Sequence, residues 1–404
     1  MLTLVWVIGE LESINHNASL LEGAMDYTVQ ADLDQKLRTL EQIAITLPQI
    51  DSAARNLSHV LVTGATGLLG SYIVQDLLLH TDATIHCLVR AETAEQGLAR
   101  IAKNFSLYHL TREERSWQRL KVVPGDLQAE RLGLTLNSYH ELADTIDTIF
   151  HCAANTSFVA AYNVSRKTNV CGTCELLQFA ATQRLKEFHY VSSCSVRVPS
   201  YYRPTDTDIG LFNGYSQSKY VSERLVNFMF DQGLPGVQYN IGYLYATEDL
   251  NATSAFESLI RLFMELKLVP EMDAYFDYTP VWDVSKAMVN TALERDFRQR
   301  TQTLHHPVAL HWREIVTALQ LADSSVQAMP FATFFPIYQE FMKRYRGTRV
   351  YAMKKVLSRD FPSHLNAMFK GIVSDFSPAN CPPTFNLSDL AFAFSRVKST
   401  YEWM

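Results

Sequence analysis

The sequence predicts an α/β fold in which a doubly wound parallel sheet precedes a smaller, mostly helical part. From residue 59 onward, short β-branched runs alternate with helix-length amphipathic stretches, which is typical of βαβ units. In addition, a glycine-rich string directly follows the first of these runs. The expected strands, each bounded by Gly, Pro, Asp or Ser, cover residues 60–62, 84–89, 120–123, 148–151 and 187–191.

The length of 404 residues allows two compact domains, or one large domain with an extension. We expect residues 1–57 to form a helical N-terminal extension, because apolar side chains recur three and four positions apart in residues 33–47. Residues 58–240 would form the sheet domain, and residues 241–404 a mostly helical domain that binds the substrate. Helices are expected there over residues 255–268 and 313–321 and across much of 331–372.

Composition excludes several classes of protein. Hydrophobic residues make up 47% of the chain and charged residues 19%, which excludes a disordered or low-complexity protein. The net charge is −6 and no Lys/Arg-rich tail is present, so we expect no nucleic-acid partner. No apolar run approaches the roughly 20 residues of a membrane-spanning helix, and the apolar start at residues 2–9 lacks the basic region of a signal peptide. We therefore expect a cytoplasmic protein without a membrane span.

The six cysteines are too sparse for a disulfide framework, which indicates a reducing compartment. Cys171 and Cys174 form a C-x-x-C pair, but no second pair completes a zinc site. Their surroundings are typical of the start of a buried helix, so we interpret them as packing residues and predict no metal.

A glycine-rich string opens the first helix of the predicted sheet domain. It runs Thr63-Gly64-Ala-Thr66-Gly67-Leu68-Leu69-Gly70, directly after a strand. Glycines at these places permit a tight turn and let backbone N–H groups approach a pyrophosphate at the positive end of the helix. The strand–turn–helix context therefore predicts a dinucleotide-binding site.

The end of the second strand indicates which dinucleotide is bound. Arg90 stands where an acid would accept hydrogen bonds from the ribose hydroxyls of NAD, whereas an arginine pairs with the 2′-phosphate of NADP. Arg100, one helix face away, offers a second contact to that phosphate, and Glu92 leaves NAD as the alternative. The sequence favours NADPH.

Two further strand ends fit the same ligand. Asp126 and Leu127 follow the third strand, where a carboxylate can accept from the adenine amino group. Ala153, Ala154 and Asn155 follow the fourth, where small residues let the nicotinamide ribose lie against the backbone. In this order and spacing, the four segments predict one cofactor cleft at the ends of the strands.

Tyr215 and Lys219 are the candidate catalytic pair. Their i, i+4 spacing on a helix places the phenol and the ammonium on one face. The lysine is expected to lower the pKa of the tyrosine and to hydrogen-bond the nicotinamide ribose, so that the phenol can donate a proton near neutral pH. Ser193, at the end of the fifth strand, would hold the substrate carbonyl oxygen as negative charge develops on it, with Ser192 as the alternative.

These residues resemble the extended short-chain dehydrogenase/reductase superfamily. The finer similarity is to the thioester reductase domains that end nonribosomal-peptide and polyketide assembly lines and to those of carboxylic acid reductases. It covers roughly residues 58–320. The more specific segments are Leu88-Val-Arg90-Ala, Gly125-Asp126-Leu127, Leu132-Gly-Leu134, Thr168-Asn169-Val-Cys-Gly-Thr173, Gly214-Tyr-Ser-Gln-Ser-Lys219, Thr279-Pro280 and His306-Pro307.

The resemblance implies a Rossmann domain that binds NADPH, with Asn169 among the cofactor-binding residues. It also implies reduction of an acyl or peptidyl thioester to an aldehyde, with the alcohol as a further product. The substrate would be carried by an acyl or peptidyl carrier protein, or by CoA. The alternatives are a sugar-nucleotide epimerase or dehydratase and a non-catalytic NADP-sensing protein of the same fold.

Three features bear on the substrate and the partner. The relatives commonly have Arg-Pro-Gly where this chain has Asn240-Ile-Gly242, so the acyl preference stays open. Residues 341–359 carry many basic side chains and no acid, and this stretch is either a docking surface for an acidic carrier protein or a solvated helix face. A set of aromatic residues beside it would line an acyl pocket or, as the alternative, form helix core: Phe331, Phe334, Phe335, Tyr338 and Phe341.

Overall fold

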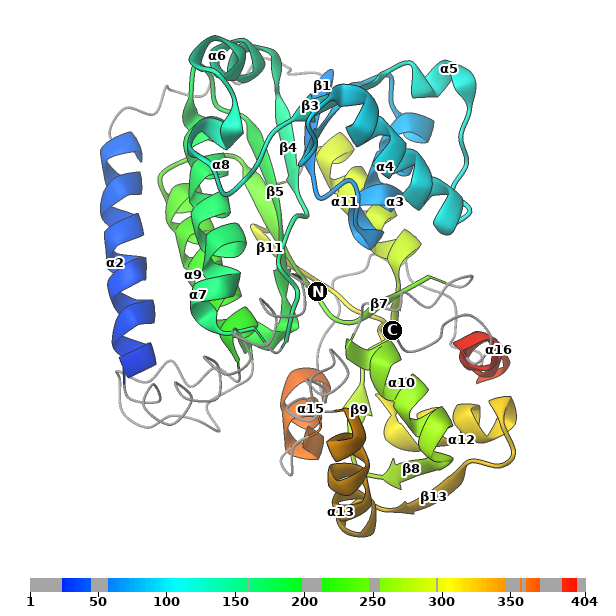
Figure 1. Cartoon of the computed structure of the whole chain (residues 1–404). Helices are drawn as coiled ribbons and strands as arrows, with labels where there is room; N and C mark the ends of the chain where they lie inside the picture. Colours follow the sequence, from blue (N-terminus) through cyan, green and yellow to red (C-terminus); the bar gives the residue numbers. More distant parts are fainter. Residues whose placement is uncertain are drawn as a thin grey trace, which may run out of the picture.

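A seven-stranded parallel sheet forms the centre of the molecule (Figure 1). The computed structural model describes residues 24–44, 57–158, 160–197, 213–246, 255–295, 297–345, 357, 361–370 and 387–397. The sheet has the order β3-β2-β1-β4-β5-β6-β11. Its strands are β1 (His59–Thr63), β2 (Thr84–Val89), β3 (Leu120–Pro124), β4 (Thr148–His151), β5 (Glu187–Ser193), β6 (Gly236–Ile241) and β11 (Thr301–Leu304). This order is that of a Rossmann fold, which confirms the predicted fold class and the five predicted strands.

Helices cover both faces of the sheet, as the right-handed crossovers between parallel strands require. Side chains of β1 alternate between the two layers: Val60 and Val62 lie in one hydrophobic cluster and Leu61 in the other. The first cluster includes α3 (Leu68–His80), α4 (Ala94–Leu107), α5 (Glu114–Trp117) and α11 (Val281–Glu294). The second includes α6 (Leu136–Thr145), α7 (Tyr162–Arg166), α8 (Gly172–Ala181) and α9 (Gly214–Asp231).

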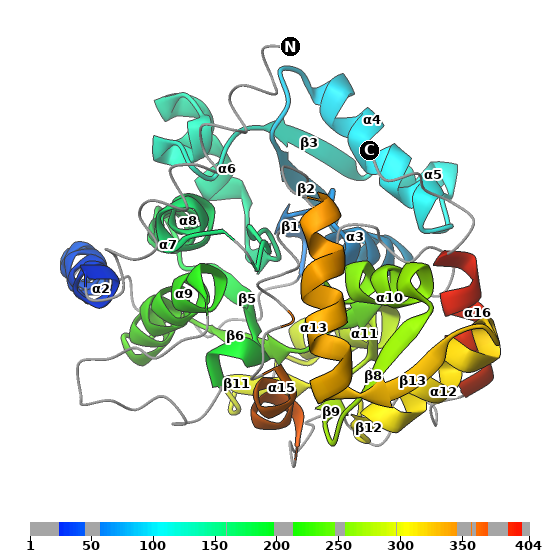
Figure 2. The same cartoon turned by 60° about the horizontal axis from the view of Figure 1, so that its bottom comes forward.

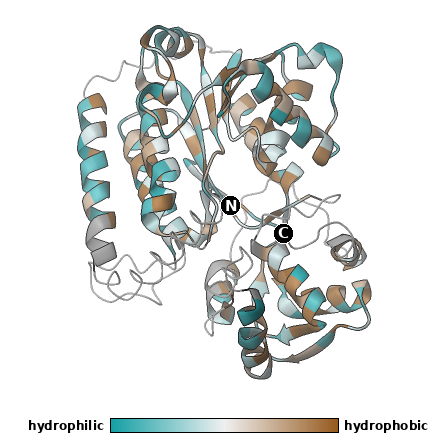
Figure 3. Cartoon of the chain, in the orientation of Figure 1, coloured by the Kyte–Doolittle hydropathy of each residue, from teal (hydrophilic) through white to brown (hydrophobic). Residues whose placement is uncertain are grey.

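An outer helix, α2 (Ala24–Ala44), packs against α8 and α9 and is largely hydrophilic on its exposed side (Figures 2 and 3). Its apolar side chains Val29, Leu33 and Leu40 are buried against the second cluster. The helix expected over residues 33–47 is therefore present, and it begins earlier. The remainder of residues 1–57, apart from Leu57 itself, lies outside the described residues.

A second lobe contains a separate core, below the sheet in Figure 1. Its helices are α10 (Ala255–Leu266), α12 (Trp312–Ala322), α13 (Phe331–Met342), α15 (Phe361–Phe369) and α16 (Leu387–Val397). Short paired strands join them: β7 (Leu244–Tyr245), β8 (Leu268–Glu271), β9 (Tyr275–Phe276), β10 (Thr279–Pro280), β12 (Leu310–His311) and β13 (Gln327–Pro330). The indole of Trp312 is buried in this core and donates to the Pro270 carbonyl at 2.8 Å.

The chain returns to the sheet after it has entered the second lobe. We expected the sheet domain to end at residue 240, but β11 pairs in parallel with β6 and α11 packs on α3. Residues 281–304 therefore belong with the sheet, although they follow the expected boundary. The physical reason is that β6 would otherwise be an unpaired edge and α3 would lack part of its apolar partner surface.

Two expectations concern the region after α12. Phe334 and Tyr338 are buried in the second core, and Phe331, Phe335 and Phe341 pack against it, so this aromatic set forms core. Most of the basic stretch 341–359, including Arg346 and Arg349, lies outside the described residues. No helix within the described ranges is both long enough and apolar enough to cross a membrane.

Candidate active site

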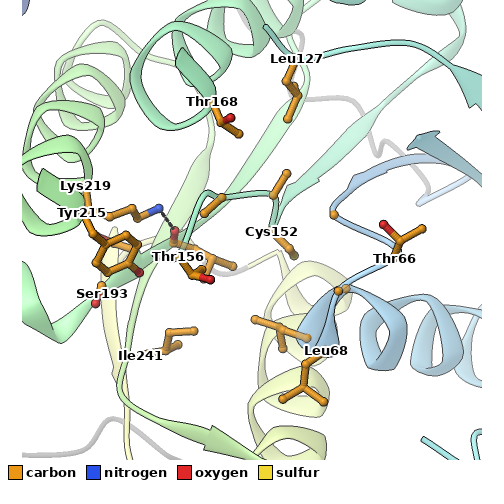
Figure 4. Close-up of a pocket in the computed structure, with 18 of the residues that line it drawn as sticks. Thr66, Leu68, Leu127, Cys152, Thr156, Thr168, Ser193, Tyr215, Lys219 and Ile241 are labelled. Atoms are coloured by element: carbon orange, nitrogen blue, oxygen red, sulfur yellow. Dashed lines mark hydrogen bonds between the residues drawn. The ribbon is translucent and has the colours of Figure 1, made fainter. Parts of the chain in front are cut away.

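A cavity of about 480 Å³ opens at the carboxyl ends of the strands, where the strand order reverses between β1 and β4 (Figure 4). Crevices at this switch point are the ligand sites of open α/β sheets. The lining comes from the ends of six neighbouring strands: Gly64 after β1, Arg90 after β2, Asp126 after β3, Ala153 after β4, Ser193 of β5 and Gly242 after β6. The sheet therefore gathers segments that lie up to 178 residues apart in the chain, from Gly64 to Gly242.

The glycine-rich turn leaves room for a ligand beside the start of α3. Gly64 has a φ of +77°, and a Cβ there would lie 2.7 Å from the Ala153 nitrogen. A Cβ on Gly70 would overlap the Gly64 carbonyl oxygen. No side chain caps the amino end of α3, so its N–H groups are available to an anion at the positive end of the helix. These features fit the pyrophosphate of a dinucleotide.

Two side chains that the sequence did not indicate, Asn104 and Ser71, hold this turn in shape. Asn104 of α4 donates its amide to the Thr66 carbonyl at 2.5 Å. The Ser71 hydroxyl donates to the Gly67 carbonyl at 2.7 Å and lies 3.1 Å from the Ala65 carbonyl. These hydrogen bonds fix the carbonyl groups of the turn within the protein.

Positive charge gathers at the end of β2. Arg90 and Arg100 both line the cavity, and a guanidinium nitrogen of Arg100 donates to the Arg90 carbonyl, which fixes one arginine relative to the other. Glu92 is exposed, lies outside the lining, and accepts from its neighbour Gln96 at 3.4 Å. The guanidinium groups at this end of the cavity can form charge-assisted hydrogen bonds with an anionic group of a ligand.

The Asp126 loop is held by the Leu-Gly-Leu turn. The Asp126 N–H donates to the Leu132 carbonyl at 2.8 Å, and the carboxylate accepts from the Gln128 N–H at 2.9 Å. A Cβ on Gly125 would come 2.6 Å from the Leu132 carbonyl oxygen. Asp126 and its neighbour Leu127 both line the cavity.

The wall after β4 divides into lining and supporting residues. Ala153 and Ala154 line the cavity, whereas Thr63, Asn155 and Asn169 stand behind it. Asn169 lies on a π-helical turn (Lys167–Cys171), a distortion often found at functional sites. Its side-chain oxygen accepts from the Asn155 N–H at 2.7 Å, and its side-chain amide donates to the Asn155 carbonyl at 3.0 Å. The same amide also donates to the Ser218 hydroxyl at 2.8 Å, and Ser218 precedes Lys219 in the chain. Asn169 therefore links the wall to the helix of the candidate catalytic pair.

His151 is a further supporting residue, buried beneath this wall. Its ring nitrogens lie 2.8 Å from the Thr63 hydroxyl and 3.0 Å from the Thr173 hydroxyl. Burial, assisted by the positive charge of Lys219, lowers the pKa of His151 to about 3. The imidazole is therefore neutral and bridges two hydroxyls at the base of the site.

Tyr215 and Ser193 lie side by side at the other end of the cavity (Figure 4). Burial raises the pKa of the Tyr215 phenol to about 12, and the hydrogen bond with Ser193 acts in the opposite direction. The expected lowering of this pKa by Lys219 is therefore wrong: burial raises the pKa, and the group that acts to lower it is Ser193. At neutral pH the phenol keeps its proton and can donate it.

Lys219 reaches the same region from the next turn of α9. Its ammonium donates to the Val191 carbonyl at 2.6 Å and lies 4.2 Å from the centre of the Tyr190 ring. Burial lowers the pKa of Lys219 to about 7, while the carboxylate of Glu223 acts to raise it. The charge on this side chain therefore changes close to neutral pH.

The two serines at the end of β5 have different partners. The Ser192 hydroxyl donates to Glu223 at 2.8 Å and is thus engaged away from Tyr215. The Ser193 hydroxyl lies 3.0 Å from that of Ser195 and interacts with Tyr215. Of the two alternatives, Ser193 is the one placed beside the phenol.

The cavity brings together most of the residues predicted from sequence. Those that line it are Gly64, Thr66, Gly67, Leu68, Leu69, Gly70, Arg90, Arg100, Asp126, Leu127, Ala153, Ala154, Ser193, Tyr215 and Lys219. The segment 241–244 also lines the cavity, in agreement with the interest of Asn240-Ile-Gly242 for the acyl preference, whereas Thr156 and Phe158 were not indicated by the sequence. The described residues hold no cluster of three His, Cys, Asp or Glu side chains that could bind a metal, and Cys174 is buried in α8.

Comparison with known proteins gives the family. A family model described as "Male sterility protein", of the NAD-binding kind, matches residues 62–288. A linear gramicidin synthase polypeptide of Brevibacillus parabrevis is 33% identical over 293 residues, which is 69% of this chain and 6% of that protein. Glycine betaine reductase ATRR of Emericella nidulans is 34% identical over 315 residues, 72% of this chain and 24% of that protein. The chain thus spans less than a third of either relative.

Solved structures agree with this placement. The terminal R domain from the myxalamid PKS-NRPS biosynthetic pathway has a TM-score of 0.75 and is 27% identical, with 92% of this chain and 97% of that chain covered. The reductase domain of a nonribosomal peptide synthetase from Mycobacterium tuberculosis shares the fold, with a TM-score of 0.64 at 24% identity. The resemblance predicted from the sequence is confirmed. The chain belongs to the NAD-binding male sterility protein family and, within it, is similar to the terminal reductase domains of peptide and polyketide synthetases.

Proposed function

We propose that this chain is an NADPH-dependent reductase that releases an acyl or peptidyl thioester as an aldehyde. The observation that carries the proposal is the joining, in one cavity, of a dinucleotide cradle around Gly64 and Gly70 with the Ser193–Tyr215–Lys219 group. The relatives named as reductases and reductase domains support a reduction rather than an epimerisation.

The preference for NADPH rests on charge. Arg90 and Arg100 are the basic side chains at the β2 end of the cavity, and Asp126, after β3, is the acidic residue of its lining. The 2′-phosphate of NADP would be held by the two guanidinium groups, and the pyrophosphate by the start of α3. In this proposal residues 58–240, together with residues 281–304, form the cofactor-binding part, and most of the remainder of 241–404 forms the substrate side.

When bound in this cavity, the nicotinamide cofactor would supply a hydride to the thioester carbonyl carbon. The hydroxyl of Ser193 and the phenol of Tyr215 donate hydrogen bonds to the carbonyl oxygen, and these strengthen as negative charge develops on it. Tyr215 then gives its proton to that oxygen, and the ammonium of Lys219 stabilises the resulting phenolate. The hemithioacetal then collapses: its carbon–sulfur bond breaks, the hydroxyl proton is given up as the carbonyl forms, and the leaving sulfur takes up a proton, which yields the aldehyde and the free thiol.

The thiol in this proposal is the phosphopantetheine of an acyl or peptidyl carrier protein, or CoA, in the cytoplasm. The R-domain neighbour comes from an assembly-line pathway, which supports a carrier partner. Product analysis distinguishes release as the aldehyde from continued reduction to the alcohol.

The test measures NADPH oxidation with a panel of acyl-CoA and acyl-carrier thioesters, with sugar nucleotides as the comparison. We expect turnover with thioesters, and loss of that turnover by at least about a hundredfold in Tyr215→Phe, the usual range for removal of a general acid. Turnover of sugar nucleotides alone, or near-normal thioester reduction in Tyr215→Phe, would contradict the proposal.

A further inference from the structure

The catalytic end of the cavity has an aromatic wall that the proposed chemistry does not itself use. The ring of Phe158 lies 5.1 Å from that of Tyr215, between centroids, and 6.2 Å from the ring of Tyr243 at an interplanar angle of 18°. Phe158 and Tyr243 line the cavity and are only partly buried. A path of ring contacts therefore leads from the catalytic phenol into the second lobe.

This wall is anchored from behind. The Tyr243 ring stacks on Phe276 at 4.8 Å and an angle of 24°, and Phe276 in turn stacks on Phe256 at 4.0 Å. Both phenylalanines are buried in the second core. Because its neighbours are fixed, Tyr243 presents a face that loses little conformational freedom when a ligand packs against it.

The charged side chains of the cavity lining are unevenly distributed between its two ends. Its charged side chains are Arg90, Arg100, Asp126 and Lys219. The first three lie at the β2 and β3 end, where the cofactor phosphate and adenine are proposed to bind. Among the described lining residues, Lys219 is thus the one charged group at the catalytic end, and its ammonium already donates to the Val191 carbonyl.

A buried acidic residue, Asp277, lies close to the catalytic end of the cavity but does not line it. The Asp277 carboxylate lies behind Gly242, pairs with His305 at 3.1 Å and accepts from the Thr279 hydroxyl at 2.7 Å. Its Oδ1 atom accepts from the Thr279 hydroxyl and from the His306 N–H, and Asp277 is not among the residues that line the cavity. Ile241 and Leu244, which flank this point, add apolar surface to the wall.

We propose that the acyl group of the substrate is a neutral, apolar chain that packs along Phe158 and Tyr243. This inference rests on the proposed function and deepens it, since it names the class of acyl group that the site accepts. A carboxylate or ammonium packed there would lose its hydration, and apart from Lys219, whose ammonium already donates to the Val191 carbonyl, the described lining at this end offers hydroxyls but no counter-ion. An apolar chain would gain the burial of its surface against two anchored rings.

The test compares two pantetheine thioesters of equal chain length, octanoyl and its ω-carboxylated analogue, with acetyl-pantetheine as reference. We expect kcat/KM to be at least about tenfold higher for octanoyl than for the carboxylated thioester, the lower end of what a hydrophobic pocket discriminates. Phe158→Ala should lower the octanoyl value by about tenfold and the acetyl value far less. Phe158→Leu and Tyr243→Phe, which keep apolar bulk, should retain the preference.

The matched control is Phe335→Ala, which removes the same ring from a partly buried site in the second core that does not line the cavity. It should leave the octanoyl-to-acetyl ratio unchanged. Equal turnover of the two eight-carbon thioesters would overturn the inference and leave the proposed function standing. If no thioester is reduced, the proposed function is overturned. The preference for the apolar over the carboxylated chain would then be tested by comparing the dissociation constants of the corresponding ketone analogues, which cannot release a thiol.

Discussion

The buried ion pair between α2 and α7 gives a prediction about the outer helix. The Asp32 carboxylate is 5% exposed and accepts from Arg166 through Nε and Nη2, each at 2.6 Å, and from the Tyr162 hydroxyl at 2.7 Å. In Asp32→Ala, both donors would be left without this acceptor. We expect the variant to be less stable, because α2 loses its buried ion pair with α7.

The size of the loss follows from burial. Removal of one partner of a buried pair costs about 3–5 kcal/mol, because the other charge is left uncompensated. The Arg166 side chain is 31% exposed, so water can partly rehydrate its guanidinium. We therefore expect the free energy of unfolding to fall by about 2–3 kcal/mol, at or below the lower end of that range.

Asp32→Ala should also lower the activity, because α7 contacts the helix that carries Tyr215. A Cβ on Gly214 would lie 2.4 Å from the Ala161 carbonyl carbon, so α7 lies directly against the start of the helix that carries Tyr215. We expect kcat of Asp32→Ala to fall while the dissociation constant of NADPH stays close to that of the unaltered chain, because the cofactor cradle lies on the far side of the cavity.

The assay is urea denaturation followed by circular dichroism, with Asp34→Ala as the matched control. Asp34 lies on the same helix, is exposed, and accepts from Gln30 at 2.8 Å, so its replacement removes the same charge without opening a buried pair. A change below about 0.5 kcal/mol in Asp32→Ala, the usual size for a surface site, would refute the reasoning.

Three further predictions concern the cavity. Because burial lowers the pKa of Lys219 to about 7, its ammonium is present below that pH and lost above it, so kcat/KM should fall as the pH rises through about 7. In Lys219→Arg the side chain stays charged, so this fall should move to higher pH in a pH profile measured by stopped flow. Arg90→Ala should weaken NADPH binding by about tenfold and leave NADH binding nearly unchanged, as measured by nicotinamide fluorescence, since one charge-assisted hydrogen bond to phosphate is lost. Gly70→Ala should abolish binding of both cofactors while the far-ultraviolet circular dichroism is retained, because its Cβ would overlap the Gly64 carbonyl that shapes the cradle; unchanged cofactor affinity would contradict this reading of the turn.

The sheet was predictable where the signal is local. Each of the five expected strands is a short run rich in β-branched and aromatic residues, and each lies within the sheet. The four residues of β11, Thr301–Leu304, carry little apolar signal, and their place beside β6 depends on a pairing across more than 60 residues. That pairing is a tertiary property, which is why the boundary expected at residue 240 differs from the structure.

The same distinction between local sequence signals and tertiary contacts applies to the residues of the candidate site. Gly64, Arg90 and Tyr215 could be placed from the sequence because each holds a fixed offset from a strand end or along a helix. Phe158 and Tyr243 come from connections whose approach to Tyr215 depends on how the second lobe packs. The direction of the Tyr215 pKa was likewise beyond the sequence, because burial, which dominates it, exists only in the folded chain.

The most direct test of the central claim follows the hydride itself. The protein is mixed with an octanoyl-carrier thioester and NADPH that carries deuterium at the transferable position of the nicotinamide, and the released product is trapped and examined by mass spectrometry. We predict one deuterium on the aldehyde carbon, free carrier thiol in equal amount, and neither product with Tyr215→Phe. Release of the unlabelled acid, or of a labelled product from Tyr215→Phe at the normal rate, would contradict the account.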